Sequence, residues 1–192
     1  AIDGGALAGR GLEIAWLDDP VDVYFLQVQG SGRLRLPDGR VLRLGYAGKN
    51  GHSYRSLGQA LIDQGALAAS EASAPVIQEW VRANGAAGQA ALGYNPSYVF
   101  FRVLKDLPPE KGPLGALGRS ITAGLSAAVD PAFTPLGAPI WVEKAGADPL
   151  QRLMVAQDTG GAIKGPQRAD LFYGTGAAAG AAVPGTSRTA VT

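Results

Sequence analysis

The sequence lacks cysteine, has a single histidine and carries almost no net charge. Its 192 residues include 17 Lys and Arg against 16 Asp and Glu, for a net charge of +1. The absence of cysteine excludes disulfides, thiolate nucleophiles and thiolate metal ligands. With only His52 available, a zinc site would need carboxylates for nearly every ligand, so we expect neither a metal nor another cofactor. A charge so close to zero also argues against a nucleic-acid partner.

Several common sequence signatures are also missing. No stretch of about 18 apolar residues occurs, so no membrane-spanning helix is predicted. The segment 45–51 superficially resembles a phosphate loop, but two residues separate its first glycines where four are needed, and Asn50 follows Lys49 in place of Ser or Thr. The Gly30-Ser31-Gly32 segment is too short for a dinucleotide fingerprint, and no G-x-S-x-G nucleophile elbow is present.

The composition that remains is typical of a folded globular protein, with 46% apolar and 17% charged residues. The clearest local pattern is a β-hairpin, in which alternating segments at 33–36 and 41–46 flank a turn set by Pro37 and Gly39. We expect Arg33, Arg35 and Arg43 to share its solvated face. A β-branched and aromatic run predicts a strand at 22–29, after a short helix at 12–17. Further helices are predicted at 53–64 and 75–92, and strands at 98–104, 127–130, 138–144, 151–158 and 169–173.

The character of the chain changes at Asn95, after which short strands alternate with Gly and Pro. Such a pattern indicates a small barrel or sandwich and not a βαβ sheet. We therefore place a domain boundary near 95, giving units at 1–95 and 96–180. The tail at 181–192 is rich in Ala, Gly, Thr and Ser, and we predict that it is disordered.

Two aspartates are the leading candidates for chemistry. Asp158 and Asp170 bracket a glycine-rich loop, and each adjoins an apolar, strand-like segment. An apolar wall beside a carboxyl raises its pKa and lets it donate a proton near neutral pH. The alternative, that either aspartate merely caps a turn through the backbone, stays open at this point. Glycine-rich loops elsewhere suit a sugar groove, a weaker pattern based on Gln29, Ser31, Lys49, Asn50 and Tyr54.

Six segments together resemble the membrane-bound lytic murein transglycosylase A family. They occur in the family's order across about residues 4–180, and six matching blocks in register are far more specific than one glycine-rich loop. The segments are 25–33, 45–52, 95–101, 128–130, 135–137 and 156–176.

The resemblance implies a mainly β chain with a few helices. Residues 96–180 would be the three-aspartate part of a double-psi β-barrel, and 1–95 part of a smaller β-rich domain that shares a glycan groove with it. The family's sequences begin earlier and continue into a last strand, so the barrel is expected to be incomplete in this chain. The family's three acids map to Asp130, Asp158 and Asp170.

The resemblance also implies an activity. Asp170 would be the catalytic acid and base, Asp158 would tune it, and Asp130 would be structural. Glycan would contact Gly30, Gly160, Gly161 and Lys164 besides the polar residues named above. The enzyme would cleave the β-1,4 bond between N-acetylmuramic acid and N-acetylglucosamine in peptidoglycan, leaving a 1,6-anhydro ring. The alternative is an inactive module that binds peptidoglycan or chito-oligosaccharides. The expected location is the periplasm, with membrane attachment only through a lipid anchor outside this chain.

Overall fold

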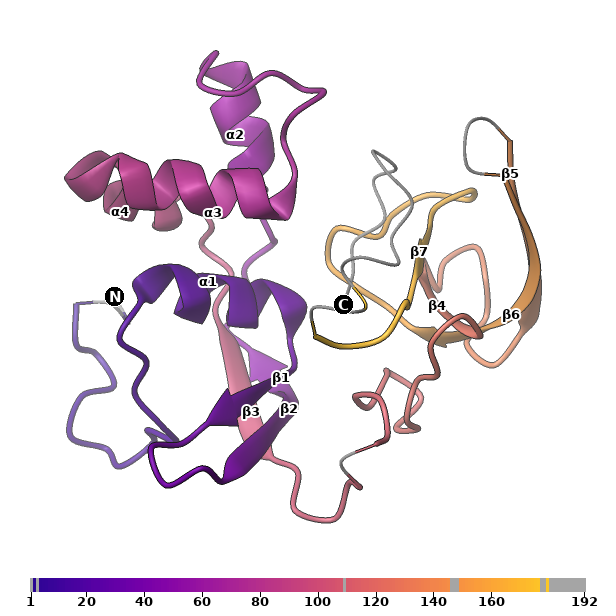
Figure 1. Ribbon diagram of the computed structural model, residues 1–192, viewed down its shortest axis with the longest axis horizontal. Coiled ribbons are helices and arrows are strands. Elements are labelled where there is room, and N and C mark those ends of the chain that lie inside the picture. Colours follow the sequence, from indigo (N-terminus) through magenta and orange to yellow (C-terminus); the bar gives the residue numbers. More distant parts are fainter. Residues whose placement is uncertain (1, 3, 109, 146–148, 177–178, 180–192) are drawn as a thin grey trace.

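The computed structural model describes residues 2, 4–108, 110–145, 149–176 and 179, which form two small sheets and four helices (Figure 1). Among these residues seven strands accompany four helices, which confirms the prediction of a mainly β chain with a few helices. The tail predicted to be disordered, 181–192, lies outside the described residues. None of the described helices has the length and apolar character needed to cross a membrane.

The first helix, α1 (Pro20–Gln29), replaces the strand that we predicted at 22–29, and the helix predicted at 12–17 does not form. The Asp19 carboxylate accepts a hydrogen bond of 2.8 Å from the Val21 N–H, which caps the helix, and Pro20 supplies a first-turn φ. Gly30 ends the helix in the left-handed region at a φ of 72°. Asp19 and Pro20, which we read as the stop of a preceding helix, are therefore the start of this one.

Packing explains why this β-prone sequence is helical. Val21, Tyr24 and Phe25 recur at helical spacing and pack into a core with Leu57 and Leu61. A strand would place Val21 and Tyr24 on opposite faces, so only a helix brings all three side chains to one core. Tertiary burial thus overrides local β propensity in this segment.

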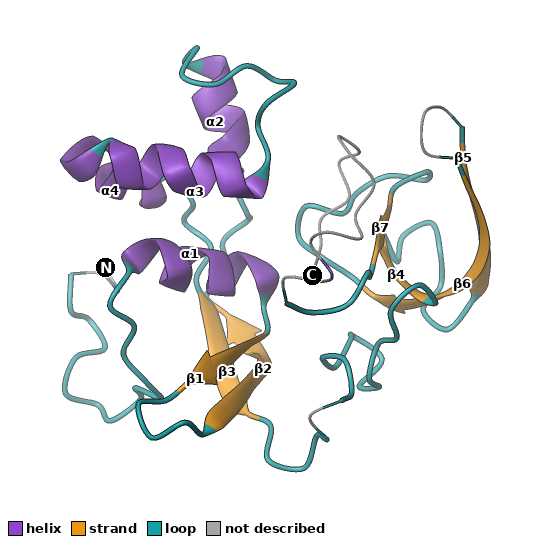
Figure 2. Cartoon of the chain, in the orientation of Figure 1, coloured by secondary structure: helices purple, strands orange, loops and turns teal. Residues whose placement is uncertain are grey.

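Three further helices complete this apolar cluster above α1 (Figure 2). They are α2 (Leu57–Asp63), α3 (Ala74–Ala83) and α4 (Gly85–Leu92). The helix predicted at 53–64 is confirmed but shorter, and the one predicted at 75–92 is divided in two. The division falls at Gly85, whose φ of 50° lies outside the right-handed helical region. A side chain at Gly88 would collide with the Val81 carbonyl, so glycine is needed for α4 to pack beside α3.

The first sheet has the order β1-β2-β3 and is antiparallel throughout. The predicted hairpin is confirmed as β1 (Gly32–Arg35) and β2 (Val41–Lys49). The third strand, β3 (Val99–Val103), lies beyond the boundary that we placed near 95, yet it hydrogen-bonds to β2. The first sheet therefore takes two strands from before that boundary and one from beyond it, and α1 lies between the sheet and the other helices (Figure 1).

Arg43 is buried, so our prediction of a solvated arginine face on the hairpin is wrong at this position. Its guanidinium donates to the carbonyl oxygens of Pro108 at 2.5 Å and Lys111 at 2.8 Å. Arg33, directly across the hairpin, remains exposed. Arg43 thus fastens the segment between the two sheets to the first sheet, and its burial is compensated by those carbonyl acceptors.

The second sheet has the order β5-β6-β4-β7 and is curled like part of a barrel (Figure 1). Its strands are β4 (Ser126–Val129), β5 (Pro139–Lys144), β6 (Leu150–Asp158) and β7 (Ala169–Leu171), close to the predicted ranges. β4 runs parallel to β6 and antiparallel to β7, and all four of its residues are buried. Because β4 is buried between β6 and β7, its pairing fixes the positions of the residues opposite it on both neighbouring strands.

The cap of α1 provides a test of the corrected first element. We expect Asp19→Ala to lower the melting temperature by about 2–4 °C, because the first turn loses its cap and Arg82 loses its 2.8 Å contact with the same carboxylate. Asp18→Ala removes a neighbouring exposed carboxylate and is the matched control. Equal effects of the two substitutions in thermal unfolding monitored by circular dichroism would contradict this account of how α1 begins.

Candidate functional site

The two leading aspartates lie on either side of one residue of β4. Ala128 pairs with Asp158 of β6 and with Asp170 of β7. Two strand spacings place the α-carbons of the aspartates about 10 Å apart. Residues that are 12 apart in the sequence are thus aligned across the sheet by strand register. The register between β4 and β6 includes a bulge immediately before Asp158, a feature that often re-aims a side chain near a functional site.

Asp170 is buried and held by an arginine. Its side chain is 2% exposed, and its two oxygens accept from Nε and Nη2 of Arg168 at 2.6 and 3.2 Å. Such a fork matches the planar geometry of a carboxylate. The hydrogen bond that Arg168 donates to Asp170 raises the pKa of Arg168 above its ordinary value. The candidate acid is therefore buried within the sheet, with a cation bound to both of its oxygens.

Asp158 combines the two roles that the sequence left open. One of its oxygens accepts from the backbone N–H groups of Thr159 at 2.9 Å and Ala116 at 3.0 Å, so it does cap the turn after β6. Burial nevertheless raises the pKa of Asp158, and these two hydrogen bonds only partly offset the rise. Asp158 thus joins the 113–118 segment to the end of β6 while its carboxyl stays in an environment that favours the protonated form.

Asp130, directly after β4, fixes the glycine-rich loop. It accepts from the N–H of Gly165 at 3.0 Å and of Ala132 at 3.2 Å, and the Lys164 ammonium lies 3.7 Å away. The hydrogen bond from Gly165, then that from Ala132, lowers the pKa of Asp130. An ionised acceptor therefore holds the loop that leads to Arg168 and Asp170.

The same loop meets the first half of the chain at Tyr54. A β-carbon added to Gly161 would lie 3.4 Å from the β-carbon of Tyr54, and one added to Gly160 would lie 2.9 Å from Ile163. Glycine at 160 therefore permits the compact loop, whereas a side chain at 161 would make an ordinary contact with Tyr54. Of the predicted glycan contacts, the structure brings together Tyr54, Gly160 and Gly161, with Lys164 further along the loop.

The remaining predicted contacts lie in the first half. Gln29, Gly30 and Ser31 follow one another at the end of α1, on the side that faces the second sheet (Figure 1). The Gln29 Oε1 atom is buried without a hydrogen-bond partner among the described residues. Lys49 is exposed at the end of β2, whereas the Asn50 amide is occupied within its loop, donating to Pro96 O at 2.9 Å and accepting from the Tyr98 N–H at 3.0 Å.

Sequence reasoning missed Arg168. Its position contained a usable signal, because side chains two residues apart at a strand share a face, and Arg168 is two residues before Asp170. Within the described part of the chain, no group of three or more His, Asp or Glu residues could hold a metal ion.

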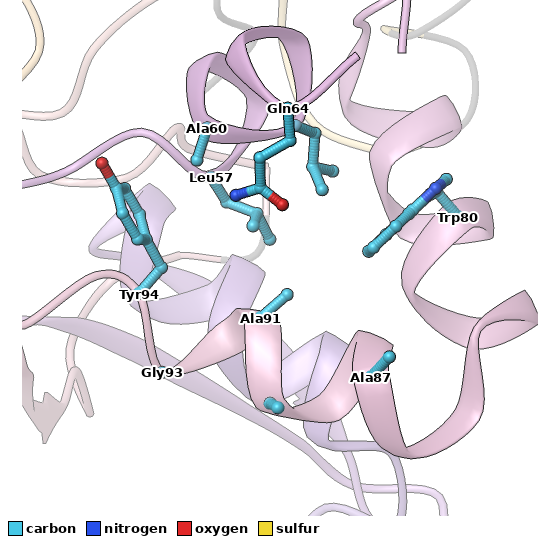
Figure 3. A pocket seen from close by; sticks show the side chains of 10 residues that line it. Leu57, Ala60, Gln64, Trp80, Ala87, Ala91, Gly93 and Tyr94 are labelled. Carbon is cyan, nitrogen blue, oxygen red and sulfur yellow. The ribbon is translucent and has the colours of Figure 1, made fainter. Parts of the chain in front are cut away.

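A separate pocket of about 470 Å³ lies among α2, α3 and α4 (Figure 3). Trp80 and Tyr94 stand on opposite sides of it, with the Gln64 amide between them and alanines along α4. All of its lining residues come from 57–94, so it is distinct from the aspartate row of the second sheet.

Comparison with known families finds two matches along the chain. The MltA specific insert domain matches residues 1–102, and the 3D domain matches residues 125–192, which include Asp130, Asp158 and Asp170. The chain belongs to the MltA family. The resemblance seen in the sequence is thereby confirmed.

Individual relatives of the MltA family are similar over nearly the whole chain. The membrane-bound lytic murein transglycosylase A of Vibrio cholerae is 37% identical over 187 residues, which are 92% of this chain and 49% of that protein. The membrane-bound lytic murein transglycosylase of Agrobacterium tumefaciens has a TM-score of 0.85 at 39% identity, covering 94% of this chain and 51% of that one. MltA of Escherichia coli with bound chitohexaose has a TM-score of 0.80 at 34% identity, covering 93% and 55%. The chain therefore spans about half the length of the relatives that it matches.

The raised pKa of Asp158 predicts how stability depends on pH. An aspartate whose folded pKa exceeds the ordinary value of 3.8 contributes stability below pH about 4, and this contribution is lost as pH rises through the folded pKa. Asp158→Asn keeps an oxygen acceptor without a charge. We therefore expect urea unfolding to show this variant gaining stability relative to the parent between pH 4 and 7.

Asp158→Ala is the matched comparison. It removes the acceptor of two backbone N–H groups, and we expect the Ala variant to be less stable than Asp158→Asn by about 1 kcal/mol for each hydrogen bond at every pH. If the Asn and Ala variants unfold alike at pH 7, the Asp158 oxygen does not hold the 113–118 segment in the way described.

Proposed function

We propose that this chain is part of a lytic transglycosylase that cleaves the β-1,4 bond between N-acetylmuramic acid and N-acetylglucosamine in peptidoglycan. The observation that carries the proposal is the placement of Asp170. It is a buried carboxyl on a short strand, aligned across Ala128 with the half-buried Asp158, within a matched 3D domain. Burial raises the pKa of Asp158, and a perturbed carboxyl close to a second one is typical of catalytic sites.

One carboxyl is sufficient for this reaction. Protonated Asp170 gives its proton to the glycosidic oxygen as the bond to C1 breaks. The resulting carboxylate then accepts the proton of the muramic acid 6-hydroxyl, whose oxygen attacks C1 and closes the 1,6-anhydro ring. Because the nucleophile belongs to the substrate, the reaction does not need the pair of reacting carboxylates used by ordinary glycosidases.

The other aspartates position and tune the catalyst in this proposal. The α-carbon of Asp158 lies about 10 Å from that of Asp170 across β4, close enough for its carboxyl to influence the charge of the site. Asp130 is the structural acid, because its hydrogen bond to Gly165 fixes the loop between the two other aspartates.

Glycan contacts are proposed from both halves of the chain. The Gly160–Gly161 loop gives a sugar close access to the backbone, and it touches Tyr54, whose ring provides an apolar face. The exposed cations Lys49 and Lys164 and the polar groups of Gln29, Gly30 and Ser31 would extend the contact surface. Asn50 is proposed to act through the shape of its loop, since its amide is already hydrogen-bonded.

An inactive glycan-binding module is the second candidate. The specific observation in its favour is that Arg168 occupies both oxygens of Asp170, and a guanidinium-bound carboxylate has no proton to donate. Both functions predict binding of chito-oligosaccharides, but only the first predicts cleavage.

A location in the bacterial envelope follows from the proposed substrate, since peptidoglycan lies there. We propose the periplasm, with any membrane attachment made through a lipid anchor outside this chain. The relatives' name, membrane-bound lytic murein transglycosylase A, supports this proposal.

Cleavage products test the proposed function. We expect the chain to release fragments with 1,6-anhydromuramic acid ends from purified peptidoglycan, detected by mass spectrometry. Asp170→Asn should reduce the rate at least about 100-fold while folding and chito-oligosaccharide binding persist, because an amide keeps the shape but cannot transfer the proton. Asp106→Asn, at an exposed position, is the control for loss of a carboxylate. Binding without any cleavage by the parent chain would favour the inactive module.

A further inference from the structure

Arg168 closes off the candidate acid. The Asp170 side chain is 2% exposed, whereas that of Arg168, which binds both of its oxygens, is 36% exposed. A glycosidic oxygen must come within hydrogen-bond distance of Asp170 to receive its proton. Because the guanidinium occupies both oxygens, at least one of its two hydrogen bonds has to break before that approach.

A second carboxylate is the group best suited to draw the guanidinium away. Arginine has five N–H donors in a rigid fork, of which two are used on Asp170. A neutral hydroxyl or amide would replace only one charge-assisted hydrogen bond with a weaker one, whereas a carboxylate can replace the pair. Arg168 is partly exposed, so such a ligand can approach it from solvent.

The proposed substrate carries such a group, and N-acetylglucosamine does not. N-acetylmuramic acid differs from N-acetylglucosamine by a lactyl arm on O3, which ends in a carboxylate or in a peptide that itself bears carboxylates. Chitin oligomers contain only N-acetylglucosamine and are uncharged. A site in which Arg168 exchanges the Asp170 carboxylate for a substrate carboxylate would therefore distinguish peptidoglycan from chitin.

We propose that Arg168 is a specificity-determining residue that transfers its guanidinium from Asp170 to a carboxylate on the muramic acid arm of the bound glycan. The inference rests on the proposed function and deepens it by naming the part of the substrate that opens the site. As the guanidinium leaves, Asp170 takes a proton from solvent, gives it to the glycosidic oxygen, and regains one from the 6-hydroxyl. Charge and protons balance, since the substrate carboxylate replaces that of Asp170 beside Arg168.

The surrounding charges permit this exchange. Lys164, on the same loop, is 64% exposed and lies 3.7 Å from Asp130, so it is paired with a different acid. Asp158, across Ala128, accepts from backbone N–H groups. Arg119 is an exposed guanidinium outside the proposed glycan contacts, which makes it the control for a nonspecific effect of positive charge.

Binding of disaccharides tests the inference without turnover. The N-acetylglucosaminyl-N-acetylmuramic acid disaccharide contains the arm but lacks the bond to be cleaved, and its lactyl amide and chitobiose are matched neutral ligands. We expect Asp170→Asn to bind the free lactyl form about tenfold more tightly than the parent does, because Arg168 no longer has a competing carboxylate. Affinities for the two neutral ligands, measured by NMR titration, should change less than about twofold.

Variants of the cation complete the test. Arg168→Gln should abolish the preference for the free lactyl form over its amide, Arg168→Lys should retain only part of it, and Arg119→Gln should retain it. A disaccharide with a dipeptide on the lactyl arm distinguishes the two carboxylate sources. If it binds as tightly as the free lactyl form, a peptide carboxylate can make the contact with Arg168. If Asp170→Asn does not fold, the comparison between the parent and Arg168→Gln decides the question.

The outcomes separate this inference from the proposed function. Equal affinity for the free lactyl form, its amide and chitobiose, or failure to bind any of them, overturns the exchange. A chain that produces anhydromuramyl ends but shows no lactyl preference retains its enzymatic function and loses only the role of Arg168. A chain with the preference but without cleavage retains the exchange and is a binding module.

Discussion

Burial of carboxylates beside one short strand is the constraint on which the second half of this protein depends. β4 is buried along its whole length, and three aspartates lie at its end or on its neighbours. A buried charge is stable only when donors surround it. Each aspartate therefore fixes another segment: Asp130 the loop at Gly165, Asp158 the turn at Ala116, and Asp170 the guanidinium of Arg168. The loops have a defined shape because each of these carboxylates needs hydrogen-bond donors.

The two halves of the chain meet through a few specific contacts. Arg43, buried in the first sheet, holds the carbonyls of the segment that leads to the second sheet. Tyr54 lies against Gly161, in the loop fixed by Asp130. The C-terminal end of α1, at Gln29, faces the second sheet (Figure 1). Loops from both halves therefore come close to each other, although the aspartates all come from one half.

Folding and the proposed chemistry place opposite demands on Asp170. Its pairing with Arg168 compensates the cost of burying a carboxylate in the ligand-free protein. Proton donation requires that the same contact be broken. A substrate that carries its own carboxylate resolves this conflict, because it can replace the ion pair without leaving an unpaired guanidinium. Stability of the resting site and selectivity for muramic acid would then have a common origin.

The sequence by itself determined the elements whose signals are local. The hairpin around Pro37 and Gly39 and the strands of the second sheet formed close to where they were predicted, because turn residues and alternating side chains act through near neighbours. Only the tertiary structure decided that 20–29 is a helix, since its side chains pack against Leu57 and Leu61 from later in the chain. It also decided the burial of Arg43, the alignment of Asp158 with Asp170 across Ala128, and the approach of Gly161 to Tyr54. These features depend on strand register and on contacts between distant residues, which no local pattern encodes.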